Sequence, residues 1–284
     1  MQWSDRAKLL REPLLIETFS PVCFVFYEAH KCYIRYVGHL EKGGWGVAKR
    51  GFKLDLDQDP RELPTYGITE AAHYLRIPSA TLRSWVVGRY YPTEHGRRFF
   101  RPIIALPEKG RHLLSFMNLV EAHVLDAIRR EHEVPLPKVR VALDYLKREF
   151  PSKHPLADQT FETDGLDLFI QKYGQLINIS QAGQLAIRSF LEAHLRRIER
   201  DPKGIPLRLY PFTRKREPDE PKVVVIDPYV SFGRPVLVGT GIPTVVIAER
   251  YKAGESVDEL AKDYDRRRFE IEEAIRCELQ LQAA

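Results

Sequence analysis

In residues 226–281, short apolar segments alternate with glycine and proline, and this pattern limits the possible folds of the chain more than any other. Pro243 suits the first turn of a helix, because its fixed φ angle and missing N–H cost nothing there. Gly254 suits the left-handed residue that ends such a helix. Ser256 and Glu259 have the spacing of a capping box, which begins the next helix. The pattern predicts a small β element followed by three short helices in a helix-turn-helix-like arrangement.

Two phrases in this stretch, DPYVSFGRPVLVGTGIPT and GESVDELAKDYD, closely resemble the C-terminal domain known as domain of unknown function number 433. Domains of that family occur in antitoxins of the VapB type. The resemblance implies that residues 223–284 dimerise or hold a toxin, and that the toxin is a small PIN-like ribonuclease. The family usually reads G-T-R-I-P where this chain has Gly241, so any contact made by that arginine is absent here.

A second informative stretch, residues 66–89, has the pattern of two short helices around a tight turn. Thr69 can cap the first helix and Ser79 the second. When Leu82 and Trp85 face inward, the polar side chains at the start of the second helix face solvent. This is the pattern of a helix-turn-helix, whose second helix directs its first residues to DNA. The DNA contacts expected from this helix are Ser79, Thr81, Arg83 and Ser84.

The next segment, YYPTEHGRRFFRPIIALP, reads as two aromatic strands around a turn, which is a β-wing. Residues 76–112 hold eight Lys or Arg and two Glu, and such an excess of positive charge is typical of a surface that binds phosphate. The phrase R-x-W-x-x-G-R-Y before the wing resembles MerR-type regulators, although the arginine-tyrosine phrase usual in their wing is absent. The further DNA contacts expected here are Arg89, Arg97, Arg98 and Arg101.

The middle of the chain predicts mostly helices. A long helix is expected from Ser115, followed by amphipathic helices over residues 138–150 and 180–200. Asp-Gly at residues 164–165 is a hairpin-turn signal, so a small β element is expected over residues 154–179. Residues 201–222 contain five prolines and a charged run, which predicts a semi-extended linker.

The fold class expected overall is mainly α with small β elements. It comprises an N-terminal winged helix-turn-helix, a middle helical region and a C-terminal trihelical, helix-turn-helix-like domain with short strands. Near the N-terminus, Pro21 to Tyr27 and Cys32 to Val37 could pair as a hairpin, but an extension that packs poorly is favoured. The expected divisions are an extension at 1–62, a MerR-like winged helix-turn-helix at 63–150, a mixed α/β region at 151–200, the linker at 201–222 and the antitoxin-type domain at 223–284.

Several classes of protein are excluded by what the sequence lacks. It has no apolar run long enough to span a membrane and no secretory signal pattern, and its three cysteines have no ligand spacing. These features predict a cytoplasmic protein without a zinc site. The histidines form no metal-binding pattern, and there is no nucleophile elbow, phosphate-binding glycine loop or pair of catalytic carboxylates. No enzyme activity, cofactor or metal is therefore expected.

The favoured function is that of a homodimeric antitoxin, which binds operator DNA and neutralises the PIN-like ribonuclease. Residues 254–284 hold nine Asp or Glu and five Lys or Arg, a balance that favours a protein partner over phosphate. Neutralisation needs only occlusion, or a basic side chain that competes with the nuclease metal for its carboxylates. The candidate partner contacts are Arg234, Arg266, Arg267 and Arg268.

One alternative belongs to a different class. A stand-alone MerR-like transcriptional regulator would sense a small molecule through its middle and C-terminal regions. A ligand pocket needs clustered aromatic and polar side chains, although ordinary core packing explains the available aromatic residues better. Those residues are Tyr145, Phe161, Phe169 and Tyr173.

Overall fold

A computed structural model of the chain describes residues 22–28, 31–40, 44–47, 52–53, 59–93, 96–108, 110–130, 136–177, 180–214 and 219–279. The chain divides into two compact units, Met1–Gln58 and Asp59–Ala284. Among the described residues, no helix is both long enough and apolar enough to cross a membrane.

The first unit contains a small antiparallel sheet built around its longest strand, β2. Strands β1, β3 and β4 each pair with β2, and Val25 of β1 lies opposite Ile34 of β2. A sheet is the stable choice for a segment so rich in β-branched and aromatic residues. The hairpin that was the less favoured expectation is thus present in this unit. The strands are β1 (Val22–Glu28), β2 (Lys31–Leu40), β3 (Gly44–Val47) and β4 (Phe52–Lys53).

The second unit begins with two short helices and a hairpin. Arg76 ends the first helix with a left-handed φ of 55°, and the N–H of Ile77 donates to the carbonyl of Ala72 at 2.9 Å. Both helices begin earlier than expected. Gly67 caps the first helix, two residues before the expected cap Thr69, and Pro78 caps the second, one residue before Ser79, so Thr69 and Ser79 are helical. The elements are η2 (Pro60–Glu62), β5 (Tyr66–Gly67), α1 (Ile68–Leu75), α2 (Ser79–Val86), β6 (Arg89–Thr93), β7 (Gly96–Phe100) and β8 (Leu113–Leu114), which pairs with β5.

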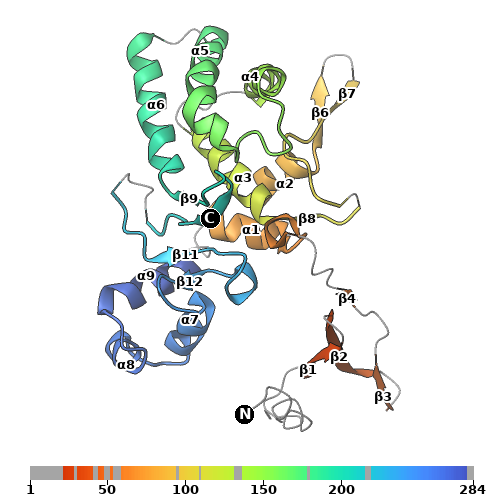
Figure 1. The fold of residues 1–284 in the computed structure, drawn as a ribbon, viewed down its shortest axis with the longest axis vertical. Helices are drawn as coiled ribbons and strands as arrows, with labels where there is room; N and C mark the ends of the chain where they lie inside the picture. Colours follow the sequence, from red (N-terminus) through yellow and green to blue (C-terminus); the bar gives the residue numbers. More distant parts are fainter. Residues whose placement is uncertain are drawn as a thin grey trace, which may run out of the picture. The chain divides into compact units, whose positions relative to one another are not determined.

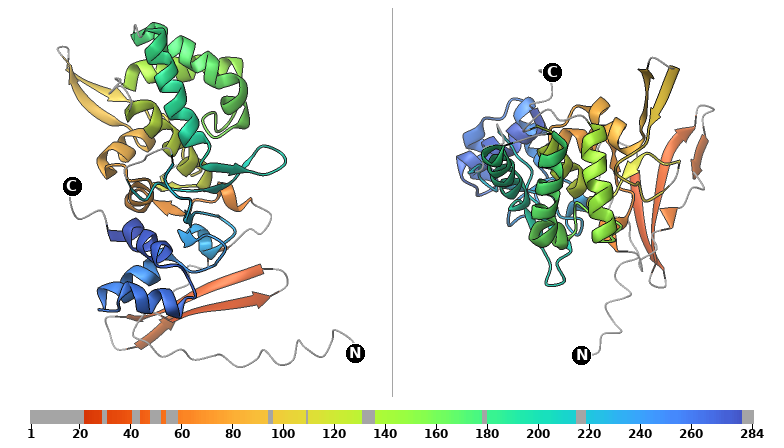
Figure 2. Two further views of the ribbon diagram at one scale, coloured as in Figure 1. Left: turned by 90° about the vertical axis from the view of Figure 1, so that its left-hand side faces the viewer. Right: turned by 90° about the horizontal axis from the view of Figure 1, so that it is seen from above.

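Helices α3 to α6 supply much of the main core of this unit, with α5 and α6 side by side (Figures 1 and 2). The prediction of a β element over residues 154–179 was wrong. Residues 161–177 are helical, and Leu166, Phe169 and Ile170 are buried at helical spacing. Gly165 serves packing instead of a turn, since a Cβ there would lie 3.0 Å from Leu146. The elements are α3 (Phe116–Arg130), α4 (Leu136–Glu149), the π-helical turn η3 (Phe161–Gly165), α5 (Leu166–Ile177) and α6 (Gln181–Leu195).

Part of the stretch expected to be a linker is folded. Strand β9 (Ile198–Arg200) pairs with β10 (Pro206–Leu209), and Leu209 bridges to Ile226. The buried Arg197 donates to the carbonyls of Tyr210 at 2.7 Å and Glu220 at 3.0 Å. Proline has no N–H with which to pair in a sheet, so this guanidinium organises a proline-rich segment through its carbonyls.

The C-terminal part of the unit has its own core, in which α7 and α8 pack against α9. Gly254 has a φ of 107°, and the capping box of Ser256 and Glu259 is present, so both local predictions are confirmed. Pro243 caps α7 and is not its first helical residue. The elements are β11 (Val224–Val225), η4 (Ser231–Gly233), β12 (Val236–Leu237), α7 (Thr244–Lys252), α8 (Val257–Asp263) and α9 (Arg268–Leu279).

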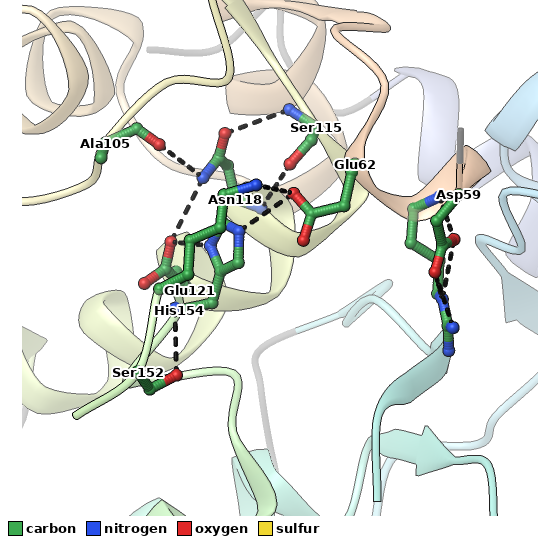
Figure 3. A network of polar contacts seen from close by, with 10 residues as sticks. Asp59, Glu62, Ala105, Ser115, Asn118, Glu121, Ser152 and His154 are labelled. Carbon is green, nitrogen blue, oxygen red and sulfur yellow. Dashed lines mark hydrogen bonds and ion pairs between the residues drawn. The ribbon is translucent and has the colours of Figure 1, made fainter. Parts of the chain in front are cut away.

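A buried polar network braces the helices behind α1 and α2 (Figure 3). His154 lies between two carboxylates, with Nδ1 at 2.9 Å from Glu121 and Nε2 at 3.1 Å from Glu62. Asn118 continues the network from Glu121 to the carbonyl of Ala105. Burial opposes the charged imidazolium, but the two carboxylates outweigh burial and raise the pKa of His154. The network therefore joins η2, α3 and the loop after α4 into one support.

Candidate nucleic-acid interface

The start of α2 presents most of its expected residues to solvent. Ser79 and Arg83 are exposed and Thr81 is half-buried, because Leu82 and Trp85 on the opposite side are fully buried. Ser84 differs from the expectation: it is buried, and its hydroxyl donates to the carbonyl of Thr81 at 2.7 Å. Its hydroxyl thus already has an acceptor within its own helix.

A hairpin of β6 and β7 carries the next set of arginines and projects from the helices (Figure 2). Arg98 lies opposite Tyr91 and Arg97 opposite Pro92. Both arginines are exposed although they point to opposite faces of β7, because neither face is covered at this end. The exposed rings of Tyr90 and Phe99 pack with centroids 5.0 Å apart.

The base of the hairpin is tied to the helices. The N–H groups of Ile103 and Ile104 donate to the carbonyl of Trp85 at 2.8 and 3.1 Å. Gly88 has a φ of 87°, and a Cβ there would lie 2.4 Å from the carbonyl oxygen of Phe100. Glycine is therefore required where the chain leaves α2, and the hairpin is held in a defined direction.

Two further arginines join this surface from the helices behind it. Arg129 of α3 helps to line a pocket of about 160 Å³, together with Ala80, Thr81, Ser84 and Arg89. Arg140 of α4 donates to the carbonyls of Arg101 and Pro102, and its guanidinium lies 4.7 Å from the ring centre of Phe100. Sequence reasoning missed both residues, because they belong to helices that follow the two-helix pattern at a distance along the chain, and only the fold brings them back to it.

The five arginines expected from the sequence to contact DNA have no acidic partner among the described residues. By contrast, Arg61, Arg200 and Arg250 elsewhere in the unit are each paired with carboxylates. A set of unpaired guanidinium groups beside a two-helix motif is suited to bind phosphate. The five are Arg83, Arg89, Arg97, Arg98 and Arg101.

The four candidate partner contacts of the C-terminal part differ among themselves. Arg268 is paired with Asp258 and Glu272. The Nη2 atom of Arg267 lies 3.4 Å from Oε1 of Glu270. Arg266 is half-buried, and its Nε has no hydrogen-bond partner among the described residues. Arg234 is exposed, and its guanidinium makes no hydrogen bond or ion pair within the described part of the chain. Arg234 is therefore the most available of the four.

Two other expectations concern ligands. In the parts of the chain that the structure describes, no group of three or more His, Cys, Asp or Glu could hold a metal ion. Two of the four aromatic residues considered for a small-molecule pocket, Phe161 and Phe169, are buried with their rings edge to face and the ring centres 5.8 Å apart. That is the packing of a core. The side chain of Tyr173 lies outside the described residues.

Two family models match separate parts of the chain. Residues 64–143 match a family described as "Putative DNA-binding HTH domain", which covers α1, α2, the hairpin, α3 and part of α4. Residues 224–276 match "Protein of unknown function (DUF433)", from β11 into α9. The region of unpaired arginines thus lies in a helix-turn-helix DNA-binding domain.

Known relatives cover most of the chain. The "Uncharacterized protein Rv2308" of Mycobacterium tuberculosis (strain ATCC 25618 / H37Rv) is 26% identical over 219 residues, which are 74% of this chain and 88% of that protein. The X-ray crystal structure of Rv2018 from Mycobacterium tuberculosis matches with a TM-score of 0.54 and 24% identity, over 75% of this chain and 98% of that one. This likeness shows a shared fold.

A further relative from the same strain bears the name "Putative antitoxin VapB45". It is 31% identical over 222 residues, which are 72% of this chain and 89% of that protein. Identity at this level over more than two thirds of both lengths shows that the two proteins belong to one family. The chain therefore belongs to the same family as the protein named "Putative antitoxin VapB45", and it carries the helix-turn-helix domain matched at residues 64–143.

Proposed function

We propose that the protein is the antitoxin of a type II toxin-antitoxin pair, and that it binds operator DNA and represses its own operon. The observation that carries the DNA-binding part is the set of five exposed arginines on α2, the hairpin and its base, which no described carboxylate neutralises. Such guanidinium groups gain binding free energy when they contact phosphate, because no internal ion pair has to be broken first.

The two elements of this surface have different tasks. Helix α2 enters the major groove, where Arg83 reads base edges and Ser79 and Thr81 contact bases or phosphates. The hairpin acts as a MerR-like wing, so Arg97, Arg98 and Arg101 hold the backbone, and Arg89 holds phosphate at the pocket below α2. Ser84 supports Thr81 through its hydrogen bond and makes no DNA contact of its own. A homodimer would place two such surfaces on two operator half-sites.

The C-terminal domain holds the toxin. Its partner is a PIN-like ribonuclease, whose acidic metal site is blocked when the complex forms. The basic candidates for this contact are Arg234 and Arg266 to Arg268. An antitoxin that represses its own operon works in the cytoplasm, where both its DNA and its toxin are found. This role needs no catalytic group, so the protein is proposed to be a non-enzymatic regulator.

The test of the DNA-binding part is a titration of the full-length protein with the DNA upstream of its own gene, against random DNA of equal length. Specific binding that weakens steeply between 50 and 200 mM salt, as roughly six or more phosphate contacts require, would support the proposal. Equal affinity for both DNA sequences at every salt concentration would contradict it.

The toxin-binding part is tested by co-expression with the neighbouring reading frame. A stable complex with a small nuclease, toxic when it is expressed alone, is the expected result. The alternative, a stand-alone MerR-like regulator that senses a small molecule, predicts operator binding without any such complex.

A further inference from the structure

One turn of the C-terminal domain displays an aromatic side chain to solvent. Phe232 in η4 is 79% exposed, the highest value among the large apolar residues that the structure describes. Three successive residues, Ser231, Phe232 and Gly233, have φ angles of 47°, 56° and 74°. The left-handed region is unfavourable for serine and phenylalanine, because the Cβ crowds the following carbonyl. Strain of this kind persists only where the surroundings impose it, and it is concentrated at functional sites.

The start of the turn is fixed by a buried carboxylate. Asp227 is 4% exposed, and it accepts the N–H of Tyr229 at 2.9 Å and the Nε–H of Arg208 at 2.9 Å. The hydroxyl of Ser231 donates to the carbonyl of Gly241 at 3.1 Å. These contacts hold the turn against β10 and against the loop before α7.

The end of the turn is fixed by the helix-turn-helix domain. The buried hydroxyl of Tyr66 donates to the carbonyl of Gly233 at 3.1 Å. A Cβ on Gly233 would lie 2.1 Å from that hydroxyl, so only glycine allows this approach. Because both ends are clamped, the backbone of Phe232 is held in one conformation before any partner arrives. Preorganisation of this kind lowers the entropy that is lost on binding.

The stretch of sequence that contains the turn has few charged residues, as the core of an interface does. Residues 223–243 contain only two charged side chains, Asp227 and Arg234. The carboxylate of Asp227 is buried and paired with Arg208 of β10, so within this stretch the exposed charge is Arg234, which makes no ion pair with any residue that the structure describes. Tyr229 is 55% exposed beside them. Aromatic residues and arginine are enriched at the energetic centres of interfaces, where acidic residues and lysine are depleted.

We propose that this turn is the toxin-docking element: Phe232 enters an apolar pocket of the toxin, and Arg234 pairs with carboxylates at the rim of that pocket. The inference rests on the proposed antitoxin function and names the site that performs it. An acidic nuclease surface is the occupant that fits the charges. Arg234 attracts such a surface because it makes no ion pair with any described residue, whereas Arg250 and Arg268 of the same domain are already paired with Asp263 and Asp258.

The test uses the full-length protein and the polypeptide encoded by the neighbouring reading frame, with affinity measured by titration calorimetry. Phe232→Ala is expected to weaken binding by about 30-fold or more, as the loss of an interface hot spot does. Tyr251→Ala, which removes a 41% exposed aromatic ring from α7 of the same domain, is the matched control. It is expected to change the affinity by less than about twofold. Equal affinity of Phe232→Ala and the unaltered protein would overturn the inference.

Phe232→Gly separates docking from folding, because glycine accepts a positive φ without strain. Its melting temperature is expected to be at least that of the unaltered protein, while the toxin affinity falls as it does for Phe232→Ala. Arg234→Ala is expected to lower the affinity by about tenfold, against little change for Lys262→Ala on α8. A Phe232→Gly protein that is folded and binds normally would overturn the inference.

The remaining outcomes are also decisive. If the unaltered protein binds no polypeptide from the neighbouring frame, the antitoxin proposal fails and the docking element fails with it. If the unaltered protein binds and both Phe232 variants bind alike, only the docking element fails. Loss of the homodimer in Phe232→Ala, measured by light scattering, with toxin binding retained, would assign the turn to a second copy of the chain and overturn the inference.

Discussion

The second unit contains the same local turn twice, in two regions with different charges. Arg76 ends α1 with a φ of 55°, and Asp265 follows α8 with a φ of 50°. In both places a backbone N–H donates to the carbonyl of the residue five positions earlier, at 2.9 Å. The N–H of Ile77 donates to Ala72, and that of Arg266 donates to Ala261. Each turn then leads into a second helix, α2 or α9. The backbone geometry of the turn therefore does not distinguish a DNA-binding motif from one with another role.

The difference lies in how the arginines after each turn are paired. On α2, Arg83 is exposed and makes no ion pair with any described residue. On α9, Arg268 is held by Asp258 and Glu272. A guanidinium that already has two carboxylates gains little from a phosphate, because it must give up one partner for another. Charge pairing, more than helix geometry, separates the two motifs.

The largest change in DNA affinity is expected when the arginines proposed to bind phosphate are removed from the first motif. The triple variant Arg89→Ala, Arg97→Ala and Arg98→Ala should lower the affinity for operator DNA by about 100-fold or more at low salt. The plot of log affinity against log salt should become shallower by roughly 0.9 for each phosphate that is no longer neutralised. Fluorescence anisotropy over a salt series measures both quantities.

The second motif provides the control. Arg267→Ala with Arg268→Ala should leave DNA affinity within about twofold and the salt slope unchanged, since phosphate is not expected to compete with their carboxylates. A comparable loss of DNA binding in this double variant would show that both motifs touch DNA, and the distinction by charge pairing would not hold.

A smaller, more selective effect is expected from Arg83→Ala. If Arg83 reads base edges, its removal should reduce the preference for operator over random DNA by about 1–3 kcal/mol. Affinity for random DNA should change much less. Competition titrations with the two DNA sequences measure this ratio, and an equal loss on both would make Arg83 a phosphate contact.

The sequence predicted the elements whose signal is local. The pattern of Leu82 and Trp85, the capping box of Ser256 and Glu259, and the left-handed Gly254 all appear in the structure. The prediction of a helix-turn-helix within residues 63–150 is confirmed by the family match over residues 64–143, and the likeness of the C-terminal part to the DUF433 family is also confirmed. Short-range backbone preferences and hydrophobic period determine these features, so few residues suffice to recognise them.

Two of the failures were caused by contacts between residues that are far apart in the sequence. The Asp-Gly pair at 164–165 is a turn signal on its own, but the side chain of Leu146 needs the space that Gly165 leaves. The proline-rich segment after β9 reads as a linker until Arg197 is placed among its carbonyls. A third difference is local: Ser84 is an expected DNA contact, but it is buried and its hydroxyl donates to the carbonyl of Thr81 three residues earlier. The exposure of the five expected arginines was thus predictable from the sequence, but the positions of Arg129 and Arg140 near them were not.

The two motifs also touch each other, and the contact predicts a dependence on pH. Glu278 of α9 accepts a hydrogen bond from Thr244 at 2.5 Å, and its carboxylate lies 3.2 Å from Nε2 of His73 in α1. Burial opposes the ionised carboxylate, but the contacts with His73 and Thr244 outweigh it and lower the pKa of Glu278. Because its folded pKa lies below its unfolded value, Glu278 adds stability above the unfolded pKa. That contribution is lost as pH falls through the folded pKa.

Glu278→Gln should accordingly reduce the free energy of unfolding at pH 7 by about 1–2 kcal/mol. The difference from the unaltered protein should shrink as the pH is lowered below about 4.5, the usual value for a free glutamate. Urea unfolding at several pH values tests this. A difference that stays constant down to pH 3 would mean that the charge of Glu278 contributes nothing.

The smallest effect on stability is expected from two serines at helix starts. Ser79 begins α2 of the first motif, and Ser256 precedes α8 of the second. Ser256 caps α8, and its hydroxyl accepts the N–H of Glu259 at 3.2 Å. Ser79 does not cap α2, because Pro78 occupies the cap position. Ser256→Ala should therefore lower the free energy of unfolding by about 1 kcal/mol. Ser79→Ala, an exposed substitution at a helical position, should lower it by less than about 0.5 kcal/mol.

The same pair of variants should behave in the opposite order with DNA. Ser79→Ala is expected to weaken operator binding by a few fold, since Ser79 stands at the exposed start of α2, whereas Ser256→Ala should leave it unchanged. Denaturation and anisotropy on the two purified proteins decide between the roles. If Ser79→Ala destabilises the fold as much as Ser256→Ala and leaves DNA binding intact, its serine is structural and the start of α2 is not the reading end of the helix.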